Sequence, residues 1–496
     1  MVHSCLSLLP FFVLKCTIDI LILLIPYCKL TRSHAREALL MADVQASLRM
    51  PASASDLFNY ISRYIGCNHQ IHCILKVNGL VDVTLLRKSL TLAIEAEPVL
   101  RCRFVEQDPF SFWEQYDDID SIELCSLVET DQTEAELHRF VNAPVDSYRD
   151  PQIQIRILRS GPSDLLCFKI DHACSDAGGL KACVSLIASM YNRLCIDPAY
   201  KLEHKKVGNR DQSQLFPHLN ISDVKEAWER QPNRSRSTIL SFPFRSDDNV
   251  TPEFVTTPFD PIHFHKLRRY AHQKGVTLND ILLTALYRTL FATTDPPAGR
   301  LIPLQVTVDL RQFLPIKQAD AICNLSGIIT PMIERVSGES FSDTLMKVST
   351  MMQELKRFAP GIRSVLLSEI YGRLGFREYY DWLMSGWNRS VETKSYPPIF
   401  SNIGKISDGK IHFGALEVTD GYMIGPALCT PGSLIAASTY QDRLTLAMAF
   451  YEPAISRNRV AQFFDSMIRE IYLAIGAQPA QVPVRKSVIA YNLSAY

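Results

Sequence analysis

Apolar and polar positions follow two different periods along this chain, and each period predicts one kind of element. A two-residue alternation is typical of strands, and apolar residues spaced by three or four are typical of helices. In the first half the pattern predicts helices over residues 55–64 and 82–98, and strands over 70–79, 99–106, 153–160 and 165–171. The first half is therefore predicted to form an α/β lobe.

The second half restarts these patterns after a polar stretch. Residues 201–250 have few large apolar side chains, which predicts a linker that is helical around Val224 to Arg230. Beyond it we expect helices over 259–275, 277–294 and 455–476, a strand within 301–315, and two strands within 433–452. A chain of 496 residues is too long for one ordinary core. We therefore expect an N-terminal lobe over 46–200, the linker, and a C-terminal lobe over 251–496.

One apolar stretch, from Leu9 to Leu30, lies outside this arrangement. Its length is close to the ~20 residues that a membrane span needs, but Lys15 and Asp19 interrupt it. Three interpretations of residues 1–40 stay open. They are a membrane anchor that leaves the remainder cytoplasmic, a targeting peptide, and a spurious extension ahead of Met41.

Composition narrows the range of partners. The chain has 52 basic and 52 acidic residues and a formal net charge of zero, which argues against a nucleic-acid partner. It has no zinc-finger spacing, no GxxxxGK[ST] loop and no GxGxxG turn, so we expect neither a metal site nor a bound nucleotide cofactor. Its 13 cysteines include no CxxC pair. The odd number in a large chain favours reduced, mostly buried thiols in a cytoplasmic protein.

The strongest sign of chemistry is the stretch DHACSDAGG, residues 171–179. In the strand predicted before it, Leu166, Phe168 and Ile170 share one face, so His172 emerges just beyond an apolar face. After the two glycines, apolar residues from 180 to 194 recur at helical spacing. A strand, a tight turn and a helix together present a side chain from a rigid scaffold.

A neutral imidazole at this place can take a proton from a hydroxyl or amine that attacks a carbonyl carbon. Its usual pKa of about 6.5 suits that task near neutral pH. Asp176 can orient the turn by pairing with a basic residue elsewhere in the chain. The alternative is that His172 is only a satisfied histidine at a strand end. Cys174 is not expected to be a nucleophile, because adjacent loop positions rarely give the geometry that activation needs.

The same stretch resembles the HHxxxDG signature of the chloramphenicol-acetyltransferase-like superfamily. That superfamily includes condensation domains of nonribosomal peptide synthetases, alcohol acyltransferases and wax ester synthases. His172 and Asp176 match the second histidine and the aspartate, whereas Asp171 replaces the first histidine and Ala177 the glycine. Further segments resemble the superfamily in the same order, and together they cover roughly residues 46 to 475: 96–104, 275–286, 308–315, 323–327, 400–406 and 438–452.

The resemblance implies a two-lobed α/β fold with a channel between the lobes and His172, with Asp176, near its middle. It implies an acyltransferase in which His172 is the general base. The acyl donor would be a thioester of coenzyme A or of a carrier protein, as a co-substrate, and the acceptor an alcohol or amine. No cofactor would be held permanently.

Other site residues follow from the same resemblance. Ser401, Asn402 and Ser438 are expected to stabilise the oxyanion or position the substrate. Asp309 and Arg311 are expected to support the structure, as a buried ion pair at the end of a strand.

Two alternatives to a soluble acyltransferase stay open. The two departures from the signature are compatible with a catalytically silent module that binds an acyl carrier or a partner protein. The stretch from Leu9 to Leu30 is compatible with a membrane-anchored lipid acyltransferase.

Overall fold

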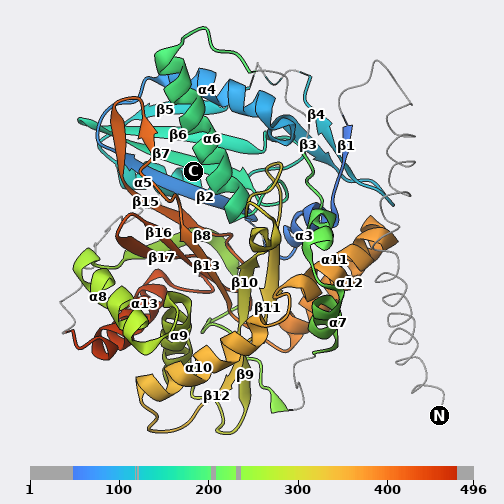
Figure 1. Cartoon of the computed structure of the whole chain (residues 1–496), viewed down its shortest axis with the longest axis vertical. Coiled ribbons are helices and arrows are strands. Elements are labelled where there is room, and N and C mark those ends of the chain that lie inside the picture. The colour runs from blue at the N-terminus through green and yellow to red at the C-terminus, as the bar shows by residue number, and fades with distance from the viewer. Residues whose placement is uncertain are drawn as a thin grey trace.

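The computed structural model describes residues 49–66, 68–117, 119, 122–202, 208–230 and 236–477. Two six-stranded sheets are at the centres of two lobes, one above the other in Figure 1, and helices cover their outer faces. The predicted two-lobed α/β fold is therefore confirmed. The predicted segment from Leu9 to Leu30 lies outside the described residues. Within the described ranges, no helix combines the length and the apolar character that a membrane span requires.

The N-terminal sheet has the strand order β14-β15-β2-β7-β6-β5. Its strands are β2 (Gln70–Val77), β5 (Cys125–Glu129), β6 (Ile153–Ser160), β7 (Ser163–Asp171), β14 (His412–Phe413) and β15 (Leu416–Ile424). Helices α4 (Val83–Ala96) and α6 (Ala177–Ile196) pack on one face, and α5 (Thr133–Asn142) packs on the other. Beside this sheet lie α3 (Ala54–Ser62), the 3-10 turn η1 (Pro98–Arg101), and a small sheet of β1 (Arg49–Pro51), β4 (Phe112–Gln115) and β3 (Cys102–Val105).

The C-terminal sheet has the strand order β11-β10-β13-β16-β17-β8. Its strands are β8 (Asn249–Pro258), β10 (Gln305–Asp309), β11 (Ser326–Ile329), β13 (Ile399–Lys405), β16 (Leu434–Tyr440) and β17 (Arg443–Pro453). One core joins it to α8 (Pro261–Lys274), α9 (Leu278–Thr294), α10 (Phe341–Lys356) and α13 (Arg457–Ala474). A two-stranded sheet of β9 (Leu301–Pro303) and β12 (Met332–Glu334) extends this lobe, and α11 (Ile362–Leu374) and α12 (Phe376–Glu392) lie beside α3 (Figure 1).

The lobes do not divide the chain as the sequence predicts. Strands β14 and β15 come from the second half, yet β15 pairs antiparallel with β2 along most of its length. Without β15, the edge of β2 would present unpaired backbone groups, which favours such a covering strand. The N-terminal lobe is therefore built from the described residues between 49 and 200 together with a late segment of the chain.

The stretch predicted as a linker also carries structure. It contains the 3-10 turn η3 (Gln212–His218) and α7 (Ile221–Glu229), and just before them Arg210 is buried. Arg210 pairs with Asp56 at 3.1 Å and donates to the Cys174 carbonyl at 3.1 Å. Trp113 Nε1 donates to the same carboxylate at 2.9 Å. Part of the predicted linker therefore packs against the loop of His172. The buried carboxylate of Asp56 needs a cationic partner, and Arg210 provides it.

Most predicted elements are present with shifted ends, but one predicted strand is shorter than expected and three helices were not predicted. The predicted strand over 99–106 begins as the turn η1 and is extended only over β3. Helices α10, α11 and α12 fall in a region where no element is predicted. Of the cysteines that the structure describes, seven of the eight free ones are buried. Cys429 is disulfide-bonded, so the expectation of reduced thiols throughout is wrong at that residue.

Candidate active site

The loop between β7 and α6 carries both motif residues, and Asp171 shapes its first turn. Asp171 Oδ1 accepts a hydrogen bond from the Ala173 amide at 2.7 Å, and its backbone carbonyl accepts one from the Cys174 amide at 3.1 Å. Its Oδ2 accepts from Ser147 Oγ at 2.6 Å and lies 3.5 Å from Arg63. Burial raises the pKa of Asp171, and the charge of Arg63 opposes that rise. The residue at the first histidine position of the signature therefore folds the loop.

His172 follows directly, with its ring deep in the protein and partly open to an internal cavity. Its amide donates to the His69 carbonyl at 3.1 Å, and its carbonyl accepts from Asn324 Nδ2 at 3.0 Å. Burial lowers the pKa of His172 from its usual value, and the charge of Asp176 opposes that change. The ring is therefore neutral at neutral pH. Its Nδ1 is buried without a hydrogen-bond partner. We therefore infer that Nε2 is the ring nitrogen that faces the cavity.

Asp176 is the N-cap of α6, and the protein satisfies its carboxylate completely. Arg311 donates to both carboxylate oxygens, at 2.9 and 3.0 Å. The amides of Gly179 and Leu325 donate at 2.8 Å each, and Ser326 Oγ donates at 2.9 Å. Burial alone would raise the pKa of Asp176, but Arg311 and these donors bring it to about 2. Asp176 thus fastens the loop to the C-terminal lobe as a permanent anion.

The two glycines of the stretch are explained by close packing. A side-chain carbon at Gly178 would lie 2.4 Å from Arg311 Nη1, and one at Gly179 would lie 2.1 Å from Ser175 Oγ. Such distances are far inside van der Waals contact, so both positions require glycine unless the neighbours move. Gly178 therefore leaves room for Arg311 to reach Asp176, and Gly179 leaves room for Ser175.

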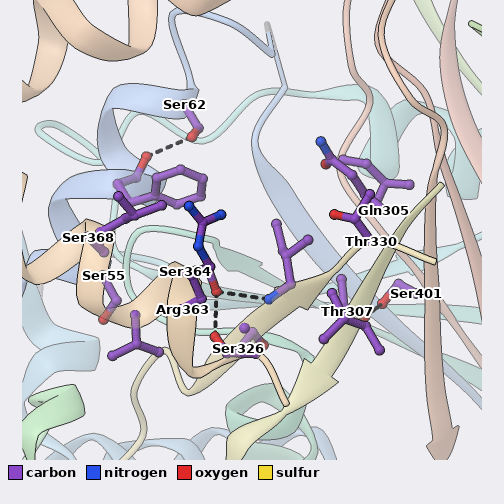
Figure 2. Close-up of a pocket in the computed structure, with 18 of the residues that line it drawn as sticks. Ser55, Ser62, Gln305, Thr307, Ser326, Thr330, Arg363, Ser364, Ser368 and Ser401 are labelled. Carbon is purple, nitrogen blue, oxygen red and sulfur yellow. Dashed lines mark hydrogen bonds between the residues drawn. The ribbon is translucent and has the colours of Figure 1, made fainter. Parts of the chain in front are cut away.

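A cavity of about 1000 Å³ opens beside His172. Its walls come from α3 of the N-terminal lobe and from α11, α12, β10, β11 and β13 of the C-terminal lobe. Figure 2 shows hydroxyl side chains that enter it from both lobes, including Ser55 of α3 and Ser326 of β11. Aromatic side chains of α3 and α12 also line the cavity, among them Phe58, Tyr379 and Trp382. The predicted channel between the lobes corresponds to this cavity.

The predicted oxyanion residues do not lie together. Ser401 lines the cavity and accepts a hydrogen bond from Thr307 Oγ1 at 3.0 Å (Figure 2). Asn402 does not line it, and its Nδ2 donates instead to Asn279 at 3.3 Å. Ser438 is fully buried, and its Oγ accepts from the Met423 amide at 3.0 Å. The expectation that Asn402 and Ser438 face the substrate is therefore wrong, because the Asn402 side chain turns to Asn279 and the Ser438 side chain turns into the packed interior.

The expected buried pair of Asp309 and Arg311 is also wrong in part. The two side chains do approach to 3.2 Å, but the Asp309 side chain is 54% exposed. The buried partner of Arg311 is Asp176, and Arg311 is itself only 9% exposed. Arg311 therefore supports the structure across the lobes, and Asp309 holds the start of a turn by accepting from the Arg311 amide.

Other reactive groups nearby do not form a second centre. Cys174 is buried, and burial raises the pKa of its thiol well above the usual value, which leaves it protonated. In the part of the chain that the structure describes, no three His, Cys, Asp or Glu side chains group together as metal ligands.

Two residues of the site were missed in the sequence. His69 stands one residue ahead of β2 and stacks on His172, with ring centroids 4.7 Å apart and planes at 13°. Asn324 Nδ2 donates to the carbonyls of both His172 and Ala173, at 3.0 and 2.9 Å. Asn324 lies in a segment that resembles the superfamily, but nothing local marks its side chain. His69 joins the site only through the pairing of β2 with β7.

Comparison with known proteins shows which family and which fold the chain resembles. Residues 65–295 match the model of a family described as Condensation domain. That stretch includes the loop of His172 and ends just after α9. No curated protein sequence matches the chain.

Solved structures share the fold across both lobes. TRI3 trichothecene 15-O-acetyltransferase from Fusarium sporotrichioides is 12% identical, with a TM-score of 0.67 over 88% of this chain and 96% of that one. A variant of the starter condensation domain of rhizomide synthetase, in complex with C8-CoA, is 13% identical (TM-score 0.61; 86% and 95% covered). The epimerization domain from the third module of tyrocidine synthetase B is 12% identical (TM-score 0.59; 88% and 99% covered).

These likenesses confirm the resemblance to the chloramphenicol-acetyltransferase-like superfamily. The chain has the condensation-domain fold. Because that fold also carries an epimerization domain, the reaction has to be argued from the site itself.

Proposed function

We propose that this protein is an acyltransferase that moves an acyl group from a thioester to an alcohol or amine, with His172 as the general base. The observation that carries the proposal is the place of the His172 imidazole, partly open to a large cavity between the lobes. Burial lowers the pKa of this ring, which favours its neutral form. A general base needs a pKa near or below the working pH and a free lone pair within reach of the acceptor.

The reaction balances with this one base. Nε2 of His172 removes the proton of the acceptor hydroxyl or amine as its oxygen or nitrogen bonds to the thioester carbonyl carbon. The carbonyl oxygen becomes an oxyanion, for which the Ser401 hydroxyl is the remaining predicted donor. The oxyanion then reforms the carbonyl, the carbon–sulfur bond breaks, and the imidazolium returns its proton to the leaving thiolate.

The cavity favours a largely apolar acceptor. Most of its lining is apolar, with hydroxyl and amide groups between, and the charge of Asp176 is neutralised by Arg311. Arg230, Glu354 and Arg363 add charged groups to the wall. At about 1000 Å³ it reaches the upper end of ordinary small-molecule sites, about 300–1000 Å³. The C8-CoA held by the starter condensation domain supports coenzyme A as one donor. We expect the protein to act in the cytoplasm, and a membrane anchor at Leu9 to Leu30 stays a prediction.

Release of free thiol tests the proposal. The full chain and its His172→Ala variant would receive acyl-coenzyme A and acyl-carrier donors with a mixed pool of alcohols and amines. We expect thiol release by the parent alone, with an ester or amide of matching mass. Equal release by the variant would contradict the role of His172. Binding of donors without any release over hours would instead favour the silent binding module.

A further inference from the structure

The site contains a second imidazole whose place is fixed by strand pairing. Gln70 of β2 lies opposite Asp171 of β7, so the next pair outward along the ladder is His69 and His172. The His172 amide donates to the His69 carbonyl at 3.1 Å, which continues the ladder. The two side chains stand on the same side, and their rings stack at 4.7 Å. Both residues line the cavity.

The Nδ1 atoms of the two rings also have similar surroundings. Nδ1 of each ring is buried and has no hydrogen-bond partner. No hydrogen bond of ordinary geometry reaches this nitrogen, although the Asn59 backbone lies near the His69 ring and the Asn324 side chain lies near the His172 ring. This differs from the well-aligned carboxylate or carbonyl partner that a histidine base often has. The ring of His172 depends on packing for its orientation, and a nearly parallel ring on one face provides such packing.

Several charged side chains lie around the two imidazole rings. Asp171 and Asp176 belong to the loop of His172. Arg63, just after α3, pairs with Asp171, and Arg311 pairs with Asp176. Arg210 pairs with Asp56 beside the same loop. Burial holds the pKa of His69 well below its usual value, and the charges of His172 and Arg63 lower it further. The stacked pair therefore disfavours double protonation, because two imidazolium rings at this separation repel each other.

We propose that His69 is a positioning residue for His172: its ring covers one face of the His172 imidazole, fixes the ring's orientation and keeps water from that face. The inference rests on the proposed role of His172 as the base. A covered ring is poorly solvated when it is protonated, so the cover also keeps His172 neutral and ready to accept a proton.

Two substitutions at His69 separate packing from hydrogen bonding. His69→Ala removes the ring, and His69→Phe keeps a flat ring but removes both nitrogens. We expect His69→Ala to lower kcat by about ten- to a hundredfold with little change in KM, since small misplacements of a catalytic group have costs of this size. We expect its acidic limb of kcat/KM against pH to move to higher pH. We expect His69→Phe to keep kcat within about threefold and the limb in place.

Other outcomes overturn the inference. A loss in His69→Phe as large as in His69→Ala would mean that a ring nitrogen contacts the substrate or moves a proton. Wild-type kinetics in both variants would mean that the stack has no effect on the base. Thermal unfolding of each variant would establish that it is folded before its kinetics are compared.

A second measurement does not depend on activity. The ring signals of His172 can be titrated by NMR in histidine-labelled protein, with His172→Gln used to assign them. We expect the titration midpoint of His172 to rise in His69→Ala and to stay in place in His69→Phe. If no variant transfers an acyl group but this shift is seen, the proposed function fails and the positioning role stands. If transfer requires His172 but the midpoint does not move in His69→Ala, the positioning role fails alone.

Discussion

The side chains at the two ends of one short loop differ in how completely the protein satisfies their hydrogen-bonding groups. His172 and Asp176 are four residues apart, yet five hydrogen bonds satisfy Asp176, and the His172 ring has none at its buried nitrogen. The carboxylate stays charged at any ordinary pH, whereas the imidazole is neutral and free to take a proton. Proton transfer needs a group whose protonation can change, so the comparison assigns chemistry to His172 and anchoring to Asp176.

The anchoring end also determines where the reactive end lies. The partners of Asp176 include Arg311, Leu325 and Ser326 of the C-terminal lobe, and Asn324 of the same lobe holds the carbonyl of His172. The loop is therefore fastened across the lobe boundary, and that fastening places His172 at the cavity between the lobes.

The largest expected effect is at the reactive end. Because His172→Ala removes the proposed base, we expect kcat/KM to fall by about 10²- to 10⁴-fold, the usual contribution of a general base. The midpoint of thermal unfolding should stay close to that of the parent. Steady-state thiol release measures the first, and calorimetry the second.

A histidine far from the cavity provides the control for this change. The His265 side chain on α8 is 56% exposed, and His265→Ala should behave as the parent does in both measurements. Undiminished turnover in His172→Ala, beside a normal control, would remove His172 from the mechanism.

The next effect is at the anchoring end and is measured as stability. Asp176→Asn keeps the shape of the side chain but removes the buried countercharge of Arg311 and leaves only the exposed carboxylate of Asp309 beside it. Breaking a buried ion pair in this way typically costs about 3–5 kcal/mol. Asp309→Asn removes the exposed carboxylate beside the same arginine and should cost less than about 1 kcal/mol. Urea unfolding of both variants measures the contrast. Equal losses would mean that Asp176 is no more important to the fold than a surface partner.

The loop that presents His172 could be predicted because its signals are local. Leu166, Phe168 and Ile170 alternate and do pack in one core, and the helix stripe that begins at Leu180 is buried as expected. The partners of the loop could not be predicted in the same way. Arg311 is 135 residues from Asp176, and His69 meets His172 only because β2 pairs with β7 in one particular register.

The error at Ser438 has a different physical cause. All seven residues of β16 are buried, so a two-residue alternation cannot distinguish a cavity face from a packed face on that strand. The burial of Arg210 could not be predicted from local sequence either. An arginine in a polar stretch is typical of an exposed linker, and its buried partner, Asp56, is far away in the sequence.

The anchoring end should also respond to acid. The pKa of Asp176 is about 2 in the folded protein, against a reference value of 3.8. A carboxyl group whose pKa is depressed by folding adds stability above its unfolded pKa and loses it as pH falls through the folded value. We therefore expect the advantage of the parent over Asp176→Asn to be complete above about pH 5 and to shrink by about 2 kcal/mol as the pH falls to 2. Urea midpoints from pH 2 to 5 measure this, and an advantage that does not change with pH would contradict it.

The smallest effects should separate two serines that the sequence treats alike. Ser401 lines the cavity, so Ser401→Ala is expected to lower kcat by about tenfold with KM nearly constant, which is about the strength of one hydrogen bond. Ser438→Ala should leave kcat/KM unchanged, because Ser438 is buried against the Met423 amide, and it should cost about 1–3 kcal/mol of stability. Kinetics and urea unfolding of the pair test both statements. If Ser438→Ala lost activity at full stability while Ser401→Ala did not, the oxyanion would have to be placed at β16 and the assignment of the cavity wall revised.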